Sequence, residues 1–108
     1  MQNISYLPLG SVVNIEGSVK KLMIISRGIV LTINGKQLFF DYGACLYPEG
    51  LVDKNLSYFN SNNITRLLFE GCKDEMGMNM SDKINEWFEK NNYEKGDINN
   101  FIGKKGGQ

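Results

Sequence analysis

The sequence contains no histidine among its 108 residues, and this absence removes more chemistry than any other feature. Histidine is the commonest general base, the commonest metal ligand and the usual pH switch. Without it, Ser11, Ser18 and Ser26 have no histidine partner that could activate them as nucleophiles. The glycine-rich segments form no Walker or dinucleotide-binding pattern, and the DxDxDG spacing of calcium loops is absent. We therefore expect no enzymatic activity, no cofactor and no metal.

The chain also lacks a net charge, because 12 lysines and arginines balance 12 aspartates and glutamates. A nucleic-acid-binding protein normally presents an excess of basic residues, whose contacts with phosphates release counterions. We therefore expect no nucleic-acid partner. A small nucleic-acid- or ligand-binding module stays open as a third alternative, since several basic residues precede two tyrosines in the sequence: Lys20, Lys21, Arg27 and Lys36.

Long apolar segments are missing too. No run approaches the roughly 20 residues of a membrane-spanning helix, and the N-terminus lacks the basic start and apolar stretch of a signal peptide. We therefore expect a cytoplasmic protein that does not insert into membranes. Cys45 and Cys72 form no CxxC motif, so we predict two free, half-buried thiols.

What is present indicates a folded, β-rich domain, since 42% of the residues are hydrophobic and 22% are charged. Asn34-Gly35 is the strongest local signal, because a two-residue type I′ turn needs positive φ at both positions. The register follows by counting outward from this turn. One face of the hairpin then carries the predicted core residues Ile29, Leu31, Leu38 and Phe40. The other face carries Val30, Thr32, Gln37, Phe39 and Asp41.

Further strands are predicted before and after this hairpin. Val12 to Ile15 and the apolar stretch Leu22 to Arg27 precede it, with a bulge or bend at Gly28. Pro48 cannot donate to a ladder, so pairing should end by Tyr47. Asn60 to Asn63 favours a short helical turn, and Leu67 to Phe69 is predicted as the last strand.

A C-terminal helix is predicted from a cap at Ser81 to about Asn92, with Ile84, Trp87 and Phe88 on one stripe. The fold class is mainly β (α+β): a small, strongly bent antiparallel sheet or SH3-like barrel of about five strands, followed by this helix. An open antiparallel sheet with the helix across one face is the alternative. We assign residues 1–95 to a single domain and residues 96–108 to a short amphipathic turn, with Ile98, Phe101 and Ile102, and a flexible tail.

Aromatic side chains and a proline follow the hairpin, and such residues supply rigid contact area at protein interfaces. The predicted partner-binding residues are Tyr42, Tyr47, Pro48, Glu49, Trp87 and Phe88. Two alternatives stay open: Tyr42 can belong to the core, and Pro48 can simply stop a strand. Asp41 and Glu49 are the carboxylates near this cluster. We interpret them as a strand-edge polar residue and a solvated turn residue, not as the acid pair of a hydrolase.

Four segments carry a resemblance: LPLGSVV, KKLMIISR, FDYGACLYPEG and YFNSNNITRLLFEG. Together they resemble a small uncharacterised family of Gram-positive bacteria, whose members are encoded beside LXG-toxin genes of the type VII secretion system. The resemblance runs from about Leu7 to Gly71, and the Asp-Tyr and Leu-Tyr-Pro-Glu-Gly elements at 41–50 are its most specific part. The family often has an aromatic residue where Cys72 stands, and residues 72–108 lie outside the resemblance.

The resemblance implies an accessory protein or chaperone that engages a secreted LXG-type toxin in the cytosol of the producing cell. It implies no catalytic residues. An immunity protein that inhibits a cognate toxin is the alternative, although such proteins often carry a marked charge opposite to that of the target. The predicted partner is therefore a protein, and the sequence leaves its identity and the oligomeric state open.

Overall fold

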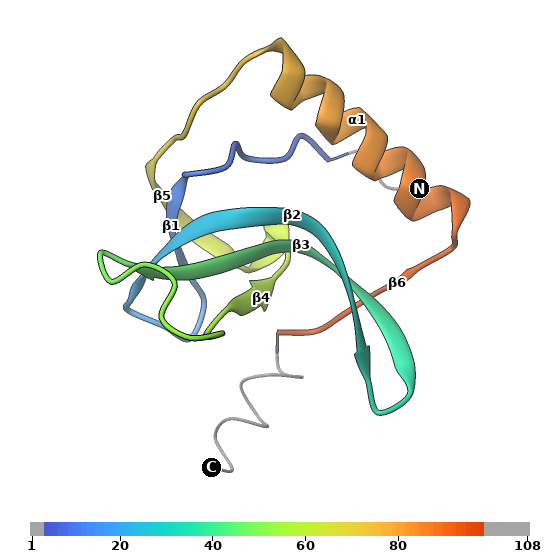
Figure 1. Ribbon diagram of the computed structural model, residues 1–108, viewed down its shortest axis with the longest axis horizontal. Helices are drawn as coiled ribbons and strands as arrows, with labels where there is room; N and C mark the ends of the chain where they lie inside the picture. Colours follow the sequence, from blue (N-terminus) through green and yellow to red (C-terminus); the bar gives the residue numbers. More distant parts are fainter. Residues whose placement is uncertain (1–3, 99–108) are drawn as a thin grey trace.

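Six strands, one 3-10 turn and one α-helix make up residues 4–98, the part of the chain that the computed structural model describes (Figure 1). The elements are β1 (Val12–Ile15), β2 (Lys21–Ile33), β3 (Lys36–Tyr47), β4 (Ser57–Phe59), η1 (Ser61–Asn63), β5 (Ile64–Phe69), α1 (Glu75–Lys90) and β6 (Glu94–Lys95). Five strands form an antiparallel sheet in the order β4-β3-β2-β1-β5, and β6 adds to β3 in parallel. The predicted mainly β fold with a C-terminal helix is confirmed. The sheet does not close into a barrel, because β4 and β5 end it on either side.

The β2–β3 hairpin is the longest pairing of the sheet. Asn34 and Gly35 both have positive φ, at 53° and 79°, as a type I′ turn requires. The predicted register is confirmed in the pairs Ile29–Phe40, Leu31–Leu38 and Ile33–Lys36. Of the two alternatives predicted at Gly28, the bulge is wrong, because the register shifts earlier, between Ile24 and Ser26. Gly28 itself has a positive φ of 66° within the continuous β2, a conformation that fits the alternative of a bend.

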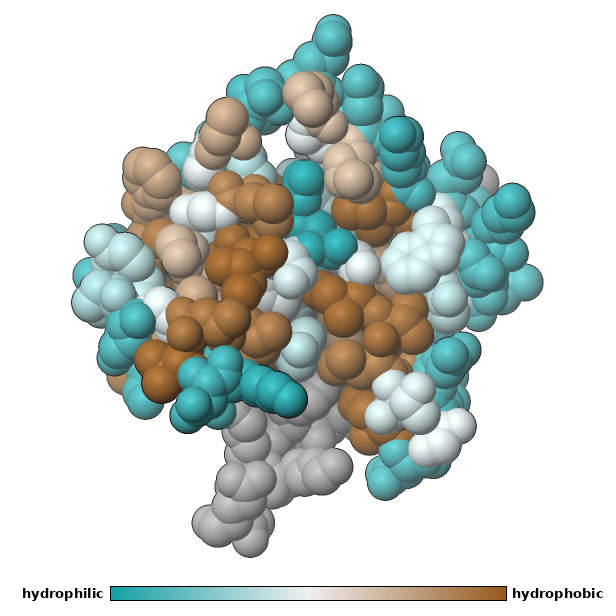
Figure 2. All heavy atoms as spheres, in the orientation of Figure 1, coloured by the Kyte–Doolittle hydropathy of each residue, from teal (hydrophilic) through white to brown (hydrophobic). Residues whose placement is uncertain are grey.

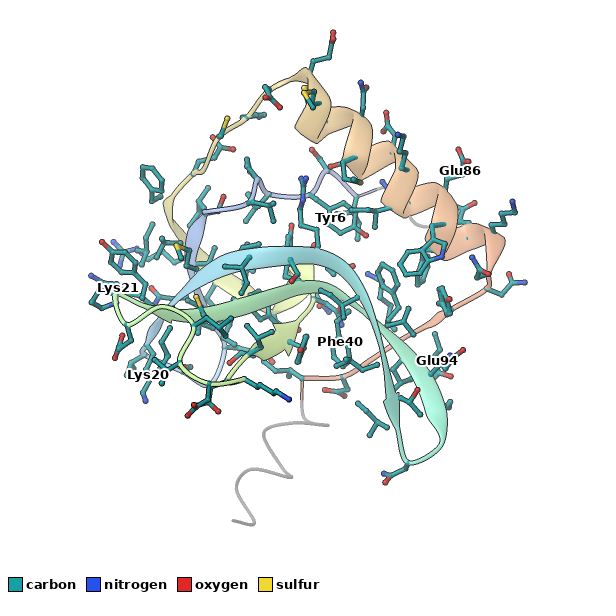
Figure 3. The ribbon with its side chains drawn as sticks, in the orientation of Figure 1. Tyr6, Lys20, Lys21, Phe40, Glu86 and Glu94 are labelled. Carbon is teal, nitrogen blue, oxygen red and sulfur yellow. The ribbon has the colours of Figure 1, made fainter. Side chains whose placement is uncertain are left out.

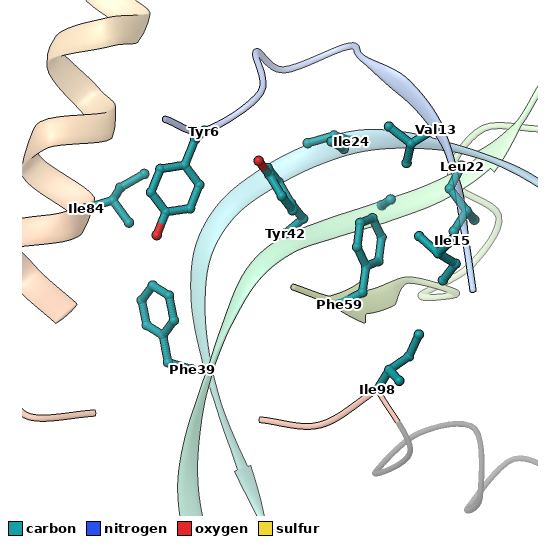
Figure 4. Close-up of a cluster of buried hydrophobic side chains, with 11 residues drawn as sticks. Tyr6, Val13, Ile15, Leu22, Ile24, Phe39, Tyr42, Phe59, Ile84 and Ile98 are labelled. Carbon is teal, nitrogen blue, oxygen red and sulfur yellow. The ribbon is translucent and has the colours of Figure 1, made fainter. Parts of the chain in front are cut away.

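Both faces of β3 are covered, which corrects the prediction of a single core face on this hairpin. Phe39 packs against Phe88 of α1, with ring centroids 4.7 Å apart, while Phe40 lies on the other side near Tyr58 of β4. Figure 4 shows the central cluster, in which Tyr6 stands between Ile84 and Tyr42. Its buried members are Tyr6, Val13, Ile15, Leu22, Ile24, Phe39, Tyr42, Ala44, Phe59, Ile84 and Ile98.

The N-cap of the helix lies seven residues earlier than predicted. Asp74 is its N-cap, and the Asp74 carboxylate accepts a hydrogen bond of 2.9 Å from the Gly77 N–H. Ser81 is therefore not a cap but a buried residue inside α1. The helix lies over the β2 side of the sheet, where Ile84 contacts Gly28 (Figure 1).

After α1 the chain returns to the sheet as β6, a strand that the sequence did not predict. The Gly96 N–H donates to the Phe39 carbonyl at 2.8 Å, and Ile98 is buried in the core. The packed domain therefore extends past the predicted limit at residue 95. Phe101, Ile102 and the predicted tail lie outside the described residues.

The remaining predictions concern the end of β3, the short helical turn, the two cysteines and membrane-spanning helices. Pairing of β3 ends at Tyr47 and η1 forms within Asn60–Asn63, as predicted. The two thiols are free, but Cys45 is buried and Cys72 is exposed, so neither is half-buried. Within residues 4–98, no helix has both the length and the apolar character needed to cross a membrane.

A candidate protein-interaction surface

An exposed apolar surface lies across one end of the sheet, over β5, β1, β2 and β3. We call it the apolar face and define it by Val12, Met23, Tyr47, Leu68 and Phe69, which line a groove of about 430 Å³. Figure 2 shows hydrophobic residues gathered on this side of the molecule, to the left in the view. Phe69 is 61% exposed and Tyr47 is 45% exposed, although both are large aromatic side chains.

The strand register explains why these side chains meet. Val12 lies opposite Met23 on one side and opposite Phe69 on the other, and Met23 lies opposite Cys45. Directly opposed residues of antiparallel strands point to the same face, so the four form a row across the sheet. Val12 and Cys45 are buried within this row, whereas Phe69 stands exposed at its margin.

A bulge in β5 enlarges the apolar face. Val12 opposes Phe69 and Val13 opposes Leu67, so Leu68 is an extra residue on the β5 side. A bulge interrupts the alternation of a strand. Leu67, Leu68 and Phe69 are all exposed, and Leu68 and Phe69 both line the groove. The sequence showed this apolar run but not its exposure, because exposure depends on what covers β5 in the fold.

Three predicted contact residues lie at or beside the apolar face. Tyr47 lines its groove, and Pro48 and Glu49 follow in the exposed turn after β3. Lys21 pairs with Tyr47 between β2 and β3 and also lines the groove. It lies at the far end of the molecule from Glu86 of α1 (Figure 3). Lys21 therefore places a positive charge at the margin of the apolar face, and Glu49 follows two residues after Tyr47 in the chain.

Tyr42 is not part of this surface, so its prediction as a contact residue is wrong and the core alternative is correct. Its side chain is 1% exposed, and its hydroxyl accepts a hydrogen bond of 2.9 Å from the Leu7 N–H. Burial raises the pKa of the Tyr42 hydroxyl above its ordinary value of 10.0. Tyr42 thus holds the N-terminal segment against β3.

Trp87 and Phe88 pack mainly on the protein itself. Both contact Phe39, with ring centroids 5.8 Å and 4.7 Å away, and Trp87 also contacts Tyr93 at 5.2 Å. Trp87 keeps 38% of its surface exposed, but neither residue lines the groove of the apolar face. The structure therefore does not join them to Tyr47 in one site.

A buried polar cluster forms a second feature, around Asp41. One carboxylate oxygen accepts from the Ser61 N–H at 2.8 Å, and the other accepts from the Lys95 ammonium. The Asn60 side chain accepts from the Asp41 N–H at 2.9 Å and donates to the Gly96 carbonyl at 2.8 Å. The prediction of Asp41 as a strand-edge residue is therefore wrong, because this carboxylate is buried and links β3, η1 and β6.

The groups of this polar cluster hold β3, η1 and β6 together. Its carboxylate, amide and ammonium groups bind one another, and the Lys95 ammonium also lies 5.6 Å and 5.4 Å from the ring centroids of Phe39 and Phe88. Glu49 is exposed in its turn, so it does not share this buried environment with Asp41. Across residues 4–98, no group of three or more cysteine, aspartate or glutamate side chains is arranged to hold a metal ion.

One known family model matches the part of the chain that contains the apolar face. A family model described as a domain of unknown function, DUF4176, matches residues 6–80. No curated protein and no solved structure matches the chain. The matched range contains the whole apolar face and the start of α1, whereas Trp87, Phe88 and Lys95 lie beyond it.

Proposed function

Because the chain belongs to the DUF4176 family of uncharacterised domains, we propose that it has the role implied by the resemblance given above. In this proposal it is a non-catalytic accessory protein that binds a type VII-secreted toxin of the LXG class in the cytosol of the producing cell. Binding covers apolar surface of the toxin before export. It stabilises the toxin conformer that it prefers, by no more than the difference in affinity between conformers.

The observation that carries this proposal is the apolar face. Contiguous apolar patches on soluble proteins, when they exceed a few hundred Å², usually mark interaction sites. Here Phe69 and Leu68 of β5 and Tyr47 of β3, all exposed, line a common groove. A rigid sheet holds these side chains in place before binding, so little conformational entropy is lost when a partner covers them.

The margin of the apolar face supports a protein partner in particular. Interfaces between proteins combine an apolar centre with a polar rim. Lys21 lines the groove beside Tyr47, and Glu49, of opposite charge, follows two residues after Tyr47 in the exposed turn. A partner with complementary charges around an apolar patch fits this arrangement.

The test is co-purification with the product of the neighbouring LXG-toxin gene. The full chain, tagged, is co-expressed with that toxin, and we expect the two to elute as one complex. Phe69→Ser and Tyr47→Ser should each weaken the measured affinity by about tenfold or more, as expected at interface hot spots. Met76→Ser is the matched control, because Met76 is 80% exposed on α1 and does not line the groove.

Folding of each variant is checked by circular dichroism and thermal melting. Absence of a complex with a folded wild-type chain would contradict the proposal. A complex that tolerates both groove variants would place binding elsewhere. The same co-expression separates the alternative role: protection of a toxin-sensitive cell indicates immunity, whereas loss of toxin secretion with unchanged viability indicates an export accessory.

A further inference from the structure

A second row of side chains runs across the sheet beside the apolar face. Asn14 opposes Arg66 between β1 and β5, and alternation along β1 places Asn14 on the same side of the sheet as Val12. Met23 opposes Val12, and Lys21 lies two residues before Met23 in β2, so both point to this side as well. We call this second set the basic row and define it by Arg66, Asn14 and Lys21.

The basic row carries two positive charges and no negative one. Lys21 and Arg66 are exposed, and neither forms an ion pair within residues 4–98. The carboxylate of Glu70, close to Arg66 in the sequence, instead lies 3.9 Å from the Lys73 ammonium. Partner surfaces are arranged so that opposite charges meet. The basic row therefore favours a partner segment that carries acidic residues.

The spacing of the strands sets the distance between these two charges. Arg66 belongs to β5 and Lys21 to β2, with β1 between them, so their backbones lie two strand spacings, or about 10 Å, apart. Two turns of an α-helix, about seven residues, rise by about 10.5 Å. Two acidic residues about seven positions apart on one side of a helix would therefore match the basic row.

One helix is wide enough to cover both rows. Lys21 and Met23 are two residues apart, so the basic row and the apolar face are separated by about 7 Å along the strands. An α-helix with its side chains is about 10–12 Å across. Val12 and Met23 lie lower than the more exposed Phe69 and Tyr47, so an apolar stripe can lie between these two aromatic side chains.

The chemistry of the groove favours a helix over an extended segment. Its lining consists mainly of apolar side chains on the surface of the sheet, where the backbone groups are already paired between strands. An extended segment buried there would leave its own N–H and C=O groups without partners, which is unfavourable. A helix pairs these groups internally and can bury one apolar stripe.

We propose that the apolar face and the basic row together bind an amphipathic helix of the protein partner, laid across β5, β1, β2 and β3. The apolar stripe of this helix covers the groove, and two acidic residues at the edge of the stripe pair with Arg66 and Lys21. This is the helix-in-groove mode of recognition. The binding mode rests on the proposed function, because it specifies the kind of segment that the toxin presents to the apolar face.

The test is selection of ligands for the full chain from a phage-displayed library of random peptides of about 16 residues, which span about 24 Å as a helix. We expect the enriched peptides to share apolar residues at i, i+3 or i+4, and i+7, with two acidic residues about seven positions apart. A synthetic member should become helical on binding, as measured by circular dichroism. Phe69→Ser should weaken its affinity about tenfold or more.

Charge reversal tests the two ion pairs. Lys21→Glu and Arg66→Glu should each weaken the affinity for the synthetic peptide about tenfold, because a like charge replaces an attractive one. Replacement of one acidic residue of the peptide by lysine should restore binding to one of these variants. Lys20→Glu is the matched control, since Lys20 is exposed directly before Lys21 but does not line the groove, and it should leave the affinity unchanged.

Three results would overturn this binding mode, provided that circular dichroism shows the variants to be folded. They are a selection that yields no ligand sensitive to Phe69→Ser, ligands with the alternating pattern of a strand, and affinities that ignore both charge reversals. The library contains no toxin, so the two proposals are tested separately. Helical ligands without a toxin complex contradict the proposed function alone, and a toxin complex without helical ligands contradicts the binding mode alone.

Discussion

Gly28 of β2 lies directly against Ile84 of α1. A Cβ atom built on Gly28 would stand only 2.7 Å from Ile84 Cγ2, and the glycine has a φ of +66°. The absence of a side chain at this position therefore lets the helix approach the sheet, and the bulky residue that fills the space comes from the helix. The contact lies on the sheet beside the core residues Tyr6 and Tyr42.

Substitution of Gly28 by alanine should therefore destabilise the protein through two effects. The positive φ is unfavourable for alanine, and the new methyl group collides with Ile84. We expect a loss of about 2–4 kcal/mol in the free energy of unfolding, measured by urea denaturation. Gly17→Ala is the control, because Gly17 also has a positive φ but has no atom within 4 Å of the built Cβ. Equal losses for the two variants would mean that the helix is not held by this close contact.

Removal of the Lys95 ammonium should leave the Asp41 carboxylate buried without its cation. Lys95→Met should cost about 3 kcal/mol, the lower end for a buried pair, because the Lys95 side chain is 31% exposed. Adding Asp41→Asn should recover part of this loss, since a neutral amide needs no counter-charge. Lys36→Met, which breaks the exposed pair with Glu94, should cost less than about 1 kcal/mol. Strictly additive effects of the Asp41 and Lys95 variants in urea denaturation would contradict a coupled pair.

Stability should fall at high pH because of Tyr42. Its pKa is raised in the folded state by burial, so between its ordinary value of 10.0 and the raised value only the unfolded chain loses the phenolic proton. Below pH 10 both states keep the proton and this contribution is constant. The difference between wild type and Tyr42→Phe, measured by denaturation from pH 8 to pH 11, should therefore shift in favour of the variant above about pH 10. If the stability of wild type and of Tyr42→Phe changed with pH in parallel up to pH 11, the raised pKa of the buried Tyr42 hydroxyl would be contradicted.

At neutral pH, the same Tyr42→Phe variant removes the acceptor of the Leu7 N–H. The expected loss there is about 1–2 kcal/mol, because one part-buried donor loses its partner. Tyr47→Phe serves as the control, since the Tyr47 side chain is largely exposed at the apolar face.

The start of α1 can be tested at its two candidate caps. Asp74→Ala removes the side chain that accepts from the Gly77 N–H and should cost about 1 kcal/mol. Ser81→Ala, inside the helix, removes no cap and should cost clearly less. Amide hydrogen exchange of residues 75–80 provides the second readout, because loss of the cap should speed exchange in this first part of the helix. A larger effect of the Ser81 variant would contradict a helix that begins at Glu75.

Local signals in the sequence predicted the local parts of the fold. Asn34-Gly35 determines both the turn and the hairpin register. A two-residue turn with positive φ at both positions fixes which residues of β2 and β3 lie opposite each other. The end of pairing at Tyr47 follows from Pro48 in the same way. Membership of an uncharacterised family is also confirmed.

Long-range contacts account for most errors. Phe39 and Asp41 are buried because α1 and β6, about 50 residues later in the chain, cover them. The alternation of apolar and polar residues within the hairpin does not indicate these distant partners. Of the residues that define the apolar face, only Tyr47 was predicted, with Pro48 and Glu49 in the turn beside it. Its Phe69 side depends on the pairing of β5 with β1 and on the bulge at Leu68, which no local pattern in the sequence indicates.

The ion pair between Asp41 and Lys95 also has a consequence for the order in which the protein folds. The two residues are 54 positions apart, so a ribosome completes the β2–β3 hairpin well before it adds the lysine. The hairpin needs only contacts that are close in sequence, and it can pair while the aspartate is still hydrated. The environment of the buried carboxylate is therefore complete only when β6, which brings Lys95, has joined the sheet.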